Sequence, residues 1–393
     1  MSRESPRAVH PVQDRHTARA QPVVASYLYR YLPLSQTFIY EELKNVRAFP
    51  LIVLAQAREN PALFPLPDVH FLQNRRYTKG WFQSQIDRRL FHLLPHERLA
   101  RRKGVKLLHA HFGGSGVLAL PLKRKLRVPL ITTFYGYDMS QRAWLNRWEK
   151  AYQELFTDGD LFLVEGNHMR QRLVELGCPE NKIEVHHIGV DTQKFKFIPR
   201  RPTDNGKVVL LFVGRIAEKK GLHYALQAIS QVYTRHKNIE FRIVGDGEIR
   251  PQIESLISEL GLEECVTLLG AQPSSRVAEE MAQAHIFLSP SVTAADGDSE
   301  GGAPTTLIEA QASGLPVVST THADIPEVVL DGKSGFLVAE RDVPALAERI
   351  TYLIESPQCW EAMGEAGRRH VEQSYDSHLI TRKLEEIYLR LLE

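Results

Sequence analysis

Short apolar runs alternate with longer amphipathic stretches along most of this chain, and this alternation restricts its possible folds more than any other feature. Parallel strands that are covered by helices on both faces produce apolar runs of this kind. A polar stretch with Pro, Gly and Asn, from about Phe197 to Gly206, interrupts the alternation, which then begins again. We therefore predict two α/β domains with parallel sheets. The predicted strands are VVASYLY, LIVLAQ, KLLHAH, PLITTFY and LFLVEG, and then KVVLLFVG, FRIVGDG, CVTLLG, IFLSPS and LPVVST.

The length of the chain also indicates two domains, because 393 residues exceed what one hydrophobic core normally holds. We predict a disordered polar tail over residues 1–21 and a Rossmann-like domain over residues 22–200. A second Rossmann-like domain is predicted over residues 201–375. Residues 376–393 are predicted to form an amphipathic helix, because apolar side chains recur there at helical spacing. These side chains are Leu379, Leu384, Ile387 and Leu391.

The composition argues against several classes of protein. The net charge of +2 gives no sign of nucleic-acid binding, and the sixteen histidines show no tight metal-ligand spacing. Three scattered cysteines suit a reducing compartment better than a disulfide framework. The N-terminus lacks the apolar core of a signal peptide, and no apolar run approaches the ~18 residues that span a bilayer. We therefore expect a cytoplasmic protein without a resident metal ion.

The segment 299–338 combines glycines, hydroxyls and two glutamates across a predicted loop, helix and strand. Residues 300–303 are predicted as the loop and residues 304–313 as the helix. The free N–H groups at a helix start bind phosphate, and paired glycines let a ligand approach the backbone closely. The alternative is a capping box of Thr306 and Glu309, in which the glutamate satisfies backbone donors only. From this segment alone, both interpretations stay open.

The run EGGAPTTLIEA, followed by SGLPVVST, IPEVV and GKSGFLV, resembles the donor-binding signature of the family 4 retaining glycosyltransferases. That family has the GT-B fold, in which two Rossmann-like domains face each other across a cleft and a C-terminal helix crosses back to the N-terminal domain. The resemblance implies that Glu309 holds the ribose hydroxyls of a nucleotide. It also implies that the diphosphate and the donor sugar contact Glu300, Gly301, Gly302, Ala303, Pro304, Thr305, Thr306 and Leu307.

The chain departs from this signature at one point. The family usually places its two glutamates eight positions apart, whereas Glu300 and Glu309 are nine positions apart. The loop therefore carries one extra residue, and Gly301 occupies the nominal first position.

The second predicted domain opens with LLFVGRIAEKKG, a strand and a glycine turn that are followed by Arg215 and Lys220. The Arg fork can chelate phosphate oxygens and Lys adds a point charge, so the pair suits a leaving diphosphate. A solvated basic surface is the common alternative. The similarity of GRIAEKKG to the family's Arg and Lys pair implies the diphosphate role, with Gly214 at the turn. Gly245 in FRIVGDG belongs to a tight turn or, by resemblance, to the nucleotide wall.

The run LPLSQTFIYEEL in the first predicted domain is an ordinary helix cap when its residues are taken alone. It also resembles the opening loop of exopolysaccharide-type members of the family. That resemblance implies acceptor-side contacts from Ser35, Gln36 and Thr37.

The run LLHAHFGGSG places His109 and His111 at the carboxyl end of a predicted parallel strand, where open α/β sheets bind ligands. Alternate strand residues point to one face, so both imidazoles can lie on the same side. A single histidine at such a position is usually structural. The match of HAHFG to the family implies that His111 contacts the sugar and that His109 and Gly113 lie on the acceptor side.

The run TTFYGYDMS places Tyr135 where many relatives carry a histidine that hydrogen-bonds the donor sugar. A tyrosine keeps a donor and an acceptor but cannot take up a proton near neutral pH. We therefore predict a hydroxyl contact and no proton abstraction at Tyr135. Asp138 either caps the following helix or binds the acceptor.

These motifs predict a retaining hexosyltransferase that moves a hexose-type sugar from a nucleotide-diphosphate sugar to a glycan or lipid-linked glycan. The resemblance implies no fixed nucleophile, because the donor phosphate accepts the proton while the protein supplies position and charge. No metal ion or cofactor is expected, and Asp296-Gly297-Asp298 is interpreted as a turn. The predicted catalytic residues are His111, Tyr135, Arg215, Lys220 and Glu300.

Two other functions stay open at this point, a nucleotide-sugar epimerase of GT-B architecture and a catalytically silent nucleotide-sugar binding protein. A nicotinamide-dependent dehydrogenase is not favoured, because HFGGSG does not complete G-x-G-x-x-G and no acidic residue follows at the required distance. The motifs do not identify the nucleobase, the sugar or the acceptor.

The segment 75–106 is strongly basic, with ten Lys or Arg residues against Asp87 and Glu97 and a net charge of +8. Aromatic and leucine side chains are interleaved with these charges. Such a segment favours an anionic membrane surface, here on the inner face of the membrane, and a lipid-linked acceptor. A solvated helix with an ordinary buried face is the alternative. No RNA-binding motif accompanies the charge.

Overall fold

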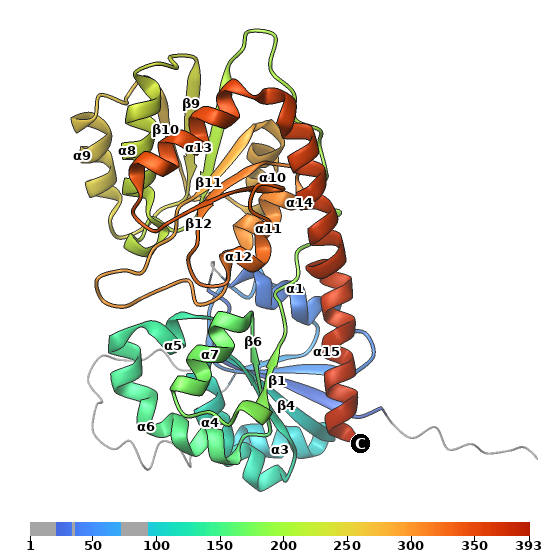
Figure 1. Cartoon of the computed structure of the whole chain (residues 1–393). Helices are drawn as coiled ribbons and strands as arrows, with labels where there is room; N and C mark the ends of the chain where they lie inside the picture. The colour runs from blue at the N-terminus through green and yellow to red at the C-terminus, as the bar shows by residue number, and fades with distance from the viewer. Residues whose placement is uncertain (1–20, 34–35, 72–92) are drawn as a thin grey trace, which may run out of the picture.

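The computed structural model describes residues 21–33, 36–71 and 93–393 (Figure 1). The predicted tail over residues 1–21 therefore lies almost entirely outside the described residues. All the strand pairs of the described chain are parallel and belong to two sheets. The first sheet has the order β3-β2-β1-β4-β5-β6-β7 and the second β10-β9-β8-β11-β12-β13.

The strands of the first sheet are β1 (Val23–Tyr31), β2 (Leu51–Arg58), β3 (Val69–Phe71), β4 (Val105–His111), β5 (Leu130–Thr133), β6 (Leu161–Val164) and β7 (Ile183–Val185). The strands of the second are β8 (Val208–Val213), β9 (Ile239–Val244), β10 (Val266–Gly270), β11 (Ile286–Ser289), β12 (Val317–Thr320) and β13 (Gly335–Val338). All six side chains of β8 are apolar and buried, because helices cover both faces of its sheet.

Helices cover both sheets. Those of the first domain are α1 (Thr37–Asn45), α3 (Leu93–Lys103), α4 (Gly113–Leu126), α5 (Tyr137–Ser140), α6 (Arg142–Asp158) and α7 (Asn167–Glu175). Those that follow β8 are α8 (Leu222–Tyr233), α9 (Arg250–Glu259), α10 (Ser274–Gln283), α11 (Thr305–Ala312), α12 (Ile325–Val328), α13 (Val343–Glu355), α14 (Trp360–Ser374) and α15 (Ser377–Leu392). No helix in the described part of the chain is both long and apolar enough to span a bilayer.

The last helix, α15, returns to the first domain. Its apolar face packs Leu384, Ile387 and Tyr388 against side chains of the first sheet such as Leu107 and Leu163. Figure 1 shows α14 and α15 in sequence along one side of the molecule, so that α15 ends beside the lower sheet. Two Rossmann-like domains joined in this way confirm the predicted GT-B fold.

The chain reaches the second domain earlier than the predicted linker between Phe197 and Gly206. The side chain of Phe195 already lies in the core of the second domain. The buried guanidinium of Arg200 donates hydrogen bonds to the carbonyl oxygens of Ala282 (2.7 Å) and Ser313 (2.5 Å). Arg200 thereby satisfies backbone carbonyls at the ends of α10 and α11, which ties this segment to the second domain.

Candidate functional site

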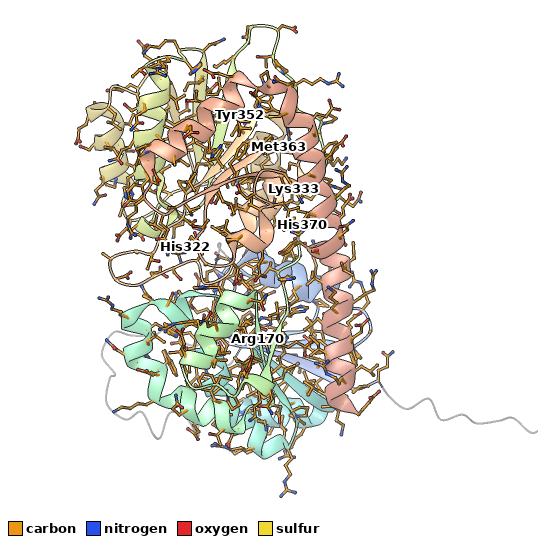
Figure 2. The ribbon with its side chains drawn as sticks, in the orientation of Figure 1. Arg170, His322, Lys333, Tyr352, Met363 and His370 are labelled. Atoms are coloured by element: carbon orange, nitrogen blue, oxygen red, sulfur yellow. The ribbon has the colours of Figure 1, made fainter. Side chains whose placement is uncertain are left out.

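The loops that follow the strands of the two sheets meet at the boundary between the domains. From the first domain come the loops after β5 and β6, and from the second the loops after β8, β11 and β12. The contact is close, because a Cβ added at Gly136 would lie 2.2 Å from the carbonyl oxygen of Glu300. Figure 2 shows His322 at this boundary and Arg170 in the domain below it. A cavity of about 500 Å³ lies between the loops and is lined by both domains, among others by Arg142, His168, Arg172, Ser299, His322 and Glu340.

Glu300 is held by the second domain through both of its carboxylate oxygens. It accepts hydrogen bonds from Nζ of Lys220 (2.9 Å) and Oγ of Ser291 (2.7 Å). Burial opposes the ionisation of Glu300, but the charges of Lys220 and Lys219 outweigh it and lower the pKa to about 2. The backbone N–H of Glu300 donates to Nε2 of His322 (3.1 Å). Glu300 is therefore an ionised anchor of the loop.

The predicted cation pair is present, but its two members differ in exposure. The side chain of Arg215 is 55% exposed, and its nearest carboxylate oxygen, on Asp298, is 4.0 Å away. Lys220 is largely buried against Glu300. The sequence analysis missed Lys219, which donates to the Asp298 carboxylate (3.1 Å) and to the Ser299 carbonyl oxygen (2.8 Å). Its position beside Lys220 in GRIAEKKG was the available signal.

The glycines of the donor loop touch the first domain. Gly301 has φ +78°, and a Cβ there would lie 2.1 Å from the Cα of Gly136. A Cβ at Gly302 would lie 2.2 Å from Oε2 of Glu165. We expected these glycines to admit a ligand, and the structure shows that they also admit the facing domain. Burial, with the nearby charges of Asp324, Asp138 and Glu300, raises the pKa of Glu165 well above its ordinary value.

The helix α11 begins one residue after the predicted start at residue 304, and the capping-box alternative for it is wrong. Its N-cap residue is Pro304 and no side chain caps it, so Thr306 stands inside the helix and cannot cap it. Burial raises the pKa of Glu309 to about 8, and its carboxyl makes no hydrogen bond to the described residues. The start of α11 and Glu309 are therefore both available to a ligand.

Gly214 and Gly245 lie against each other at the ends of β8 and β9. Gly245 has φ +149°, and a Cβ there would lie 1.8 Å from the carbonyl oxygen of Gly214. A tight turn at Gly245, one of the two interpretations of FRIVGDG, is sufficient to explain this contact. Asp298 also belongs to a turn, in which its N–H donates to the side chain of Asp296 (2.9 Å).

His109 and His111 project from β4 to the same side, as the alternation predicted, with ring centroids 4.4 Å apart. The ring nitrogens of His109 lie 2.7 Å from the hydroxyls of Tyr388 and Thr133. Nδ1 of His111 lies 2.7 Å from the hydroxyl of Tyr135. Both imidazoles are fully buried, which lowers the pKa of His111 to about 3 and that of His109 well below its ordinary value. Neither ring is accessible to a sugar in this structure.

Asp138 ties together the two loops of the first domain and does not cap the helix that follows it. Its carboxylate accepts hydrogen bonds from the backbone N–H groups of Gly113 (2.9 Å) and Tyr135 (3.0 Å). Gly113 begins α4, so Asp138 caps a helix that precedes it in the chain. Burial raises the pKa of Asp138 to about 6, although these N–H groups oppose the shift. This contact leaves the carboxylate buried within the first domain.

Two predicted regions fall partly outside the described residues. Ser35 lies outside them, whereas Gln36 precedes α1 and Thr37 begins it. In the basic segment, residues 75–92 lie outside them and α3 lies within. The described cations Arg98, Arg102 and Lys106 are exposed.

The sequence analysis also missed His322 and Asp324, which follow β12 in the run THADIPE. Nδ1 of His322 lies 2.6 Å from a carboxylate oxygen of Glu340, and Asp324 contacts the first domain. Polar residues at the carboxyl end of a parallel strand were a signal that could have found them.

Comparisons with known proteins agree with this architecture. The family model described as "Glycosyl transferases group 1" matches residues 193–370, and that described as "Glycosyltransferase Family 4" matches residues 39–194. The structure resembles Anabaena Alr3699/HepE in complex with UDP, with a TM-score of 0.78 and 17% identity, over 94% of this chain and 100% of that chain. It also resembles sucrose-phosphate synthase from Thermosynechococcus elongatus, with a TM-score of 0.74 and 17% identity, over 94% and 99% of the two chains.

Two curated relatives are similar in sequence. The putative colanic acid biosynthesis glycosyltransferase WcaL of Escherichia coli (strain K12) is 39% identical over 279 residues, which cover 70% of this chain and 68% of the relative. The amylovoran biosynthesis glycosyltransferase AmsK of Erwinia amylovora is 36% identical over 303 residues, which cover 76% and 74%. These matches confirm the resemblance that the donor-loop motifs indicated. The chain therefore belongs to the family 4 glycosyltransferases, with a group 1 glycosyltransferase domain as its second half.

Proposed function

We propose that this glycosyltransferase moves a hexose-type sugar, with retention, from a nucleotide-diphosphate sugar to a glycan or lipid-linked glycan in exopolysaccharide assembly. The observation that carries the proposal is the donor loop. This loop runs from Glu300 into the uncapped start of α11, and the side chains of Arg215 and Lys220 lie beside it. The relatives WcaL and AmsK are named for the biosynthesis of colanic acid and amylovoran, which supports the polysaccharide context. The UDP complex of the structurally similar HepE supports a nucleotide-sugar donor.

The donor diphosphate in this proposal lies between the start of α11 and the two cations. Arg215 is mostly exposed, so it can turn to phosphate oxygens without losing a close partner. Lys220 shares its charge between Glu300 and the diphosphate, and the backbone N–H groups at the uncapped start of α11 add partial positive charge. Glu309 accepts the ribose hydroxyls, because its carboxyl has no other partner among the described residues. These groups stabilise charge on the leaving diphosphate, and this transfer uses no metal ion.

Tyr135 is buried, but it precedes Gly136, which contacts the donor loop, and we assign it the sugar contact of the first domain. We assign the buried His111 to positioning Tyr135, in place of the direct sugar contact that the sequence analysis expected. Burial raises the pKa of Tyr135 well above its ordinary value, so the phenol stays neutral and exchanges hydrogen bonds only. The proton of the acceptor hydroxyl passes to the departing phosphate in this proposal.

The acceptor enters from the first domain, and the basic segment 75–106 supports a lipid-linked acceptor at an anionic membrane. In the described part of this segment, Arg98, Arg102 and Lys106 are exposed cations on and next to α3. Exposed cations near an anionic surface are attracted to it and are screened by salt.

A panel of UDP-, GDP- and ADP-sugars tests the proposed function. We expect one donor to raise the melting temperature clearly above the others and to be consumed only when a glycan acceptor is added. Conversion of the donor to its epimer without acceptor would indicate an epimerase, and binding without any conversion would indicate a silent binding protein. Retention is tested by NMR of the product, in which an inverted anomeric centre would contradict it.

A further inference from the structure

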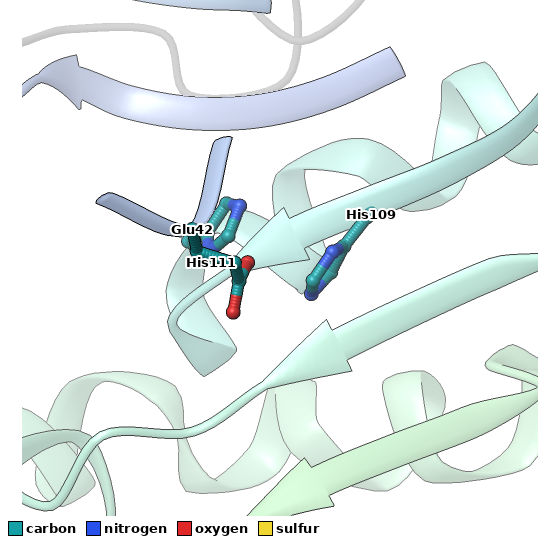
Figure 3. Close-up of side chains that lie close together, drawn as sticks. All are labelled: Glu42, His109 and His111. Carbon is teal, nitrogen blue, oxygen red and sulfur yellow. The ribbon is translucent and has the colours of Figure 1, made fainter. Parts of the chain in front are cut away.

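Three side chains of the first domain converge beside Tyr135, whose neighbour Gly136 contacts the donor loop. They are Glu42 on α1 and His109 and His111 on β4 (Figure 3). One oxygen of the carboxylate and one nitrogen of each imidazole all lie within 4.8 Å of one another. We propose that these three residues bind one divalent transition-metal ion of the Zn²⁺ class.

The chemistry of the three ligands suits such an ion. Two imidazoles and one carboxylate are a common ligand set for first-row transition metals, whereas Mg²⁺ and Ca²⁺ prefer oxygen ligands alone. His109 and His111 are alternate residues of a strand, so both rings face the same side, with their planes inclined by 32°. The sequence analysis found no metal-ligand spacing because Glu42 and His109 are 67 positions apart.

Two polar atoms of these three side chains are buried without a hydrogen-bond partner. Nε2 of His111 and Oε1 of Glu42 contact no donor or acceptor among the described residues. No Lys or Arg of the described chain forms an ion pair with Glu42 either. Buried polar atoms are nearly always paired, so two unpaired atoms in one cluster of side chains call for a further group that binds them. A cation satisfies both the imidazole lone pair and the carboxylate.

The surrounding hydroxyls form the outer shell that a metal-bound histidine normally has. A ligating imidazole usually gives its second nitrogen to a hydrogen-bonding group, which orients the ring. Nδ1 of His111 lies 2.7 Å from the hydroxyl of Tyr135, which leaves Nε2 for the ion. His109 has a hydroxyl at each nitrogen, from Tyr388 and Thr133, so one nitrogen can bind the ion while the other keeps its partner.

The burial of the cluster indicates a structural role for the ion. His109 and His111 are fully buried, so a substrate does not reach the ion, and a water molecule completes its fourth tetrahedral position. Metal to ligand distances are about 2.0–2.2 Å, so a modest movement of side chains within the 4.8 Å cluster brings all three into the coordination sphere. The ion joins α1 to β4 and, through the outer hydroxyls, to α15 and to Tyr135. It thereby holds Tyr135 in place next to Gly136, which contacts the donor loop.

The first experiment needs no variant. Untagged wild-type protein is stripped with a chelator, incubated with one equivalent of Zn²⁺ and desalted, and its zinc content and X-ray absorption spectrum are measured. We expect one zinc ion per chain with a first shell of nitrogen and oxygen and the scattering of two imidazoles. The proposal would be overturned if the protein does not retain one zinc ion per chain. It would also be overturned if the absorption spectrum shows sulfur ligands from the cysteines.

Variants then locate the ion. Tyr135→Phe removes a hydroxyl outside the coordination sphere and should lower the affinity for Zn²⁺ by about 10- to 100-fold. Glu42→Gln removes a direct ligand and should lower the affinity more. Glu41→Gln is the matched control, because Glu41 is the neighbouring carboxylate of α1 and pairs with Lys44 instead (2.6 Å). It should bind Zn²⁺ like the wild type. Equal Zn²⁺ affinity of the wild type and folded Glu42→Gln would overturn the proposal, and circular dichroism checks the fold of each variant.

Discussion

The carboxylate of Asp324 in the second domain accepts a hydrogen bond from the backbone N–H of His168 in the first domain, at 2.6 Å. The N–H of Met169 points to the same carboxylate at 3.4 Å. Both N–H groups belong to the first turn of α7, which begins after Gly166 and has no side-chain cap of its own. A side chain of one domain therefore caps a helix of the other, and the cap exists only while the two domains are in contact.

We expect Asp324→Ala to weaken the contact between the domains by about 1 kcal/mol, because α7 loses its cap. Small-angle X-ray scattering should show a larger radius of gyration. Asp342→Ala is the matched control, since Asp342 caps α13 within the second domain by accepting from Ala345 (3.0 Å). Identical scattering of Asp324→Ala and the wild type would contradict the interdomain role.

The same contact should respond to pH. Burial raises the pKa of Asp324 from 3.8 to about 6, so the closed state favours the protonated carboxyl. We expect contact between the domains to strengthen as the pH falls from about 6 towards 4, and to be constant above about 7. Asp324→Asn, a neutral side chain of the same shape, should keep the closed form without this dependence. A scattering profile of the wild type that does not change between pH 7 and 5 would contradict the prediction.

Glu300 should stabilise the second domain in the opposite pH direction. Its pKa is lowered from 4.5 to about 2, so its contribution is present above pH 4.5 and is lost as the pH falls towards 2. Glu300→Gln should lower the free energy of unfolding at pH 7 by about 1–3 kcal/mol, and the difference should shrink near pH 3. Urea denaturation measures both values. Glu254→Gln, which removes a more exposed pair with Arg250, should change the free energy by less than about 1 kcal/mol.

Glu309→Gln should weaken nucleotide binding by about 1–3 kcal/mol, because the ribose hydroxyls lose one of the two carboxyl oxygens that can accept from them. The melting temperature without nucleotide should stay close to that of the wild type, since Glu309 does not belong to a capping box. Isothermal calorimetry and differential scanning fluorimetry give the two measurements. Unchanged affinity for the nucleotide would rule out the ribose role.

Arg215→Ala should reduce turnover more than it raises KM, because the guanidinium stabilises charge that develops as the diphosphate leaves. The exposed Arg235 on the same domain offers a control with the same loss of charge. Steady-state kinetics with saturating donor separates the two parameters. A wild-type kcat in Arg215→Ala would remove Arg215 from the proposed mechanism.

The cations of the segment 75–106 should bring the enzyme to anionic vesicles. Each cation near the surface contributes about 1 kcal/mol and is screened by salt, so sedimentation with the vesicles should fade as salt rises. Replacing Arg98, Arg102 and Lys106 with Gln should reduce it and leave donor binding intact. The control replaces three exposed cations of the second domain, Arg235, Lys237 and Lys333. Equal sedimentation of both triple variants would favour a solvated surface and a soluble acceptor.

The long strands of both sheets could be predicted from the sequence, because a strand with neighbours on both sides needs a continuous apolar run. The central strand β8 illustrates this, with all six side chains buried. The strands β3, β7 and β13 were missed. They have only three or four residues, stand at sheet edges and are partly exposed, so their apolar signal is weak.

The sequence by itself determined the local chemistry of the site, namely the donor loop, the start of α11 and the cations after β8, because each is set by residues that are close in the chain. The tertiary structure alone decided the contacts between distant residues. Gly301 meets Gly136, Asp324 caps α7, and His109 meets Tyr388 because strand ends and α15 pack together. Such contacts depend on how two hydrophobic cores orient their loops, which no local pattern records. For the same reason, only the folded chain brings Glu42 to the two histidines of β4.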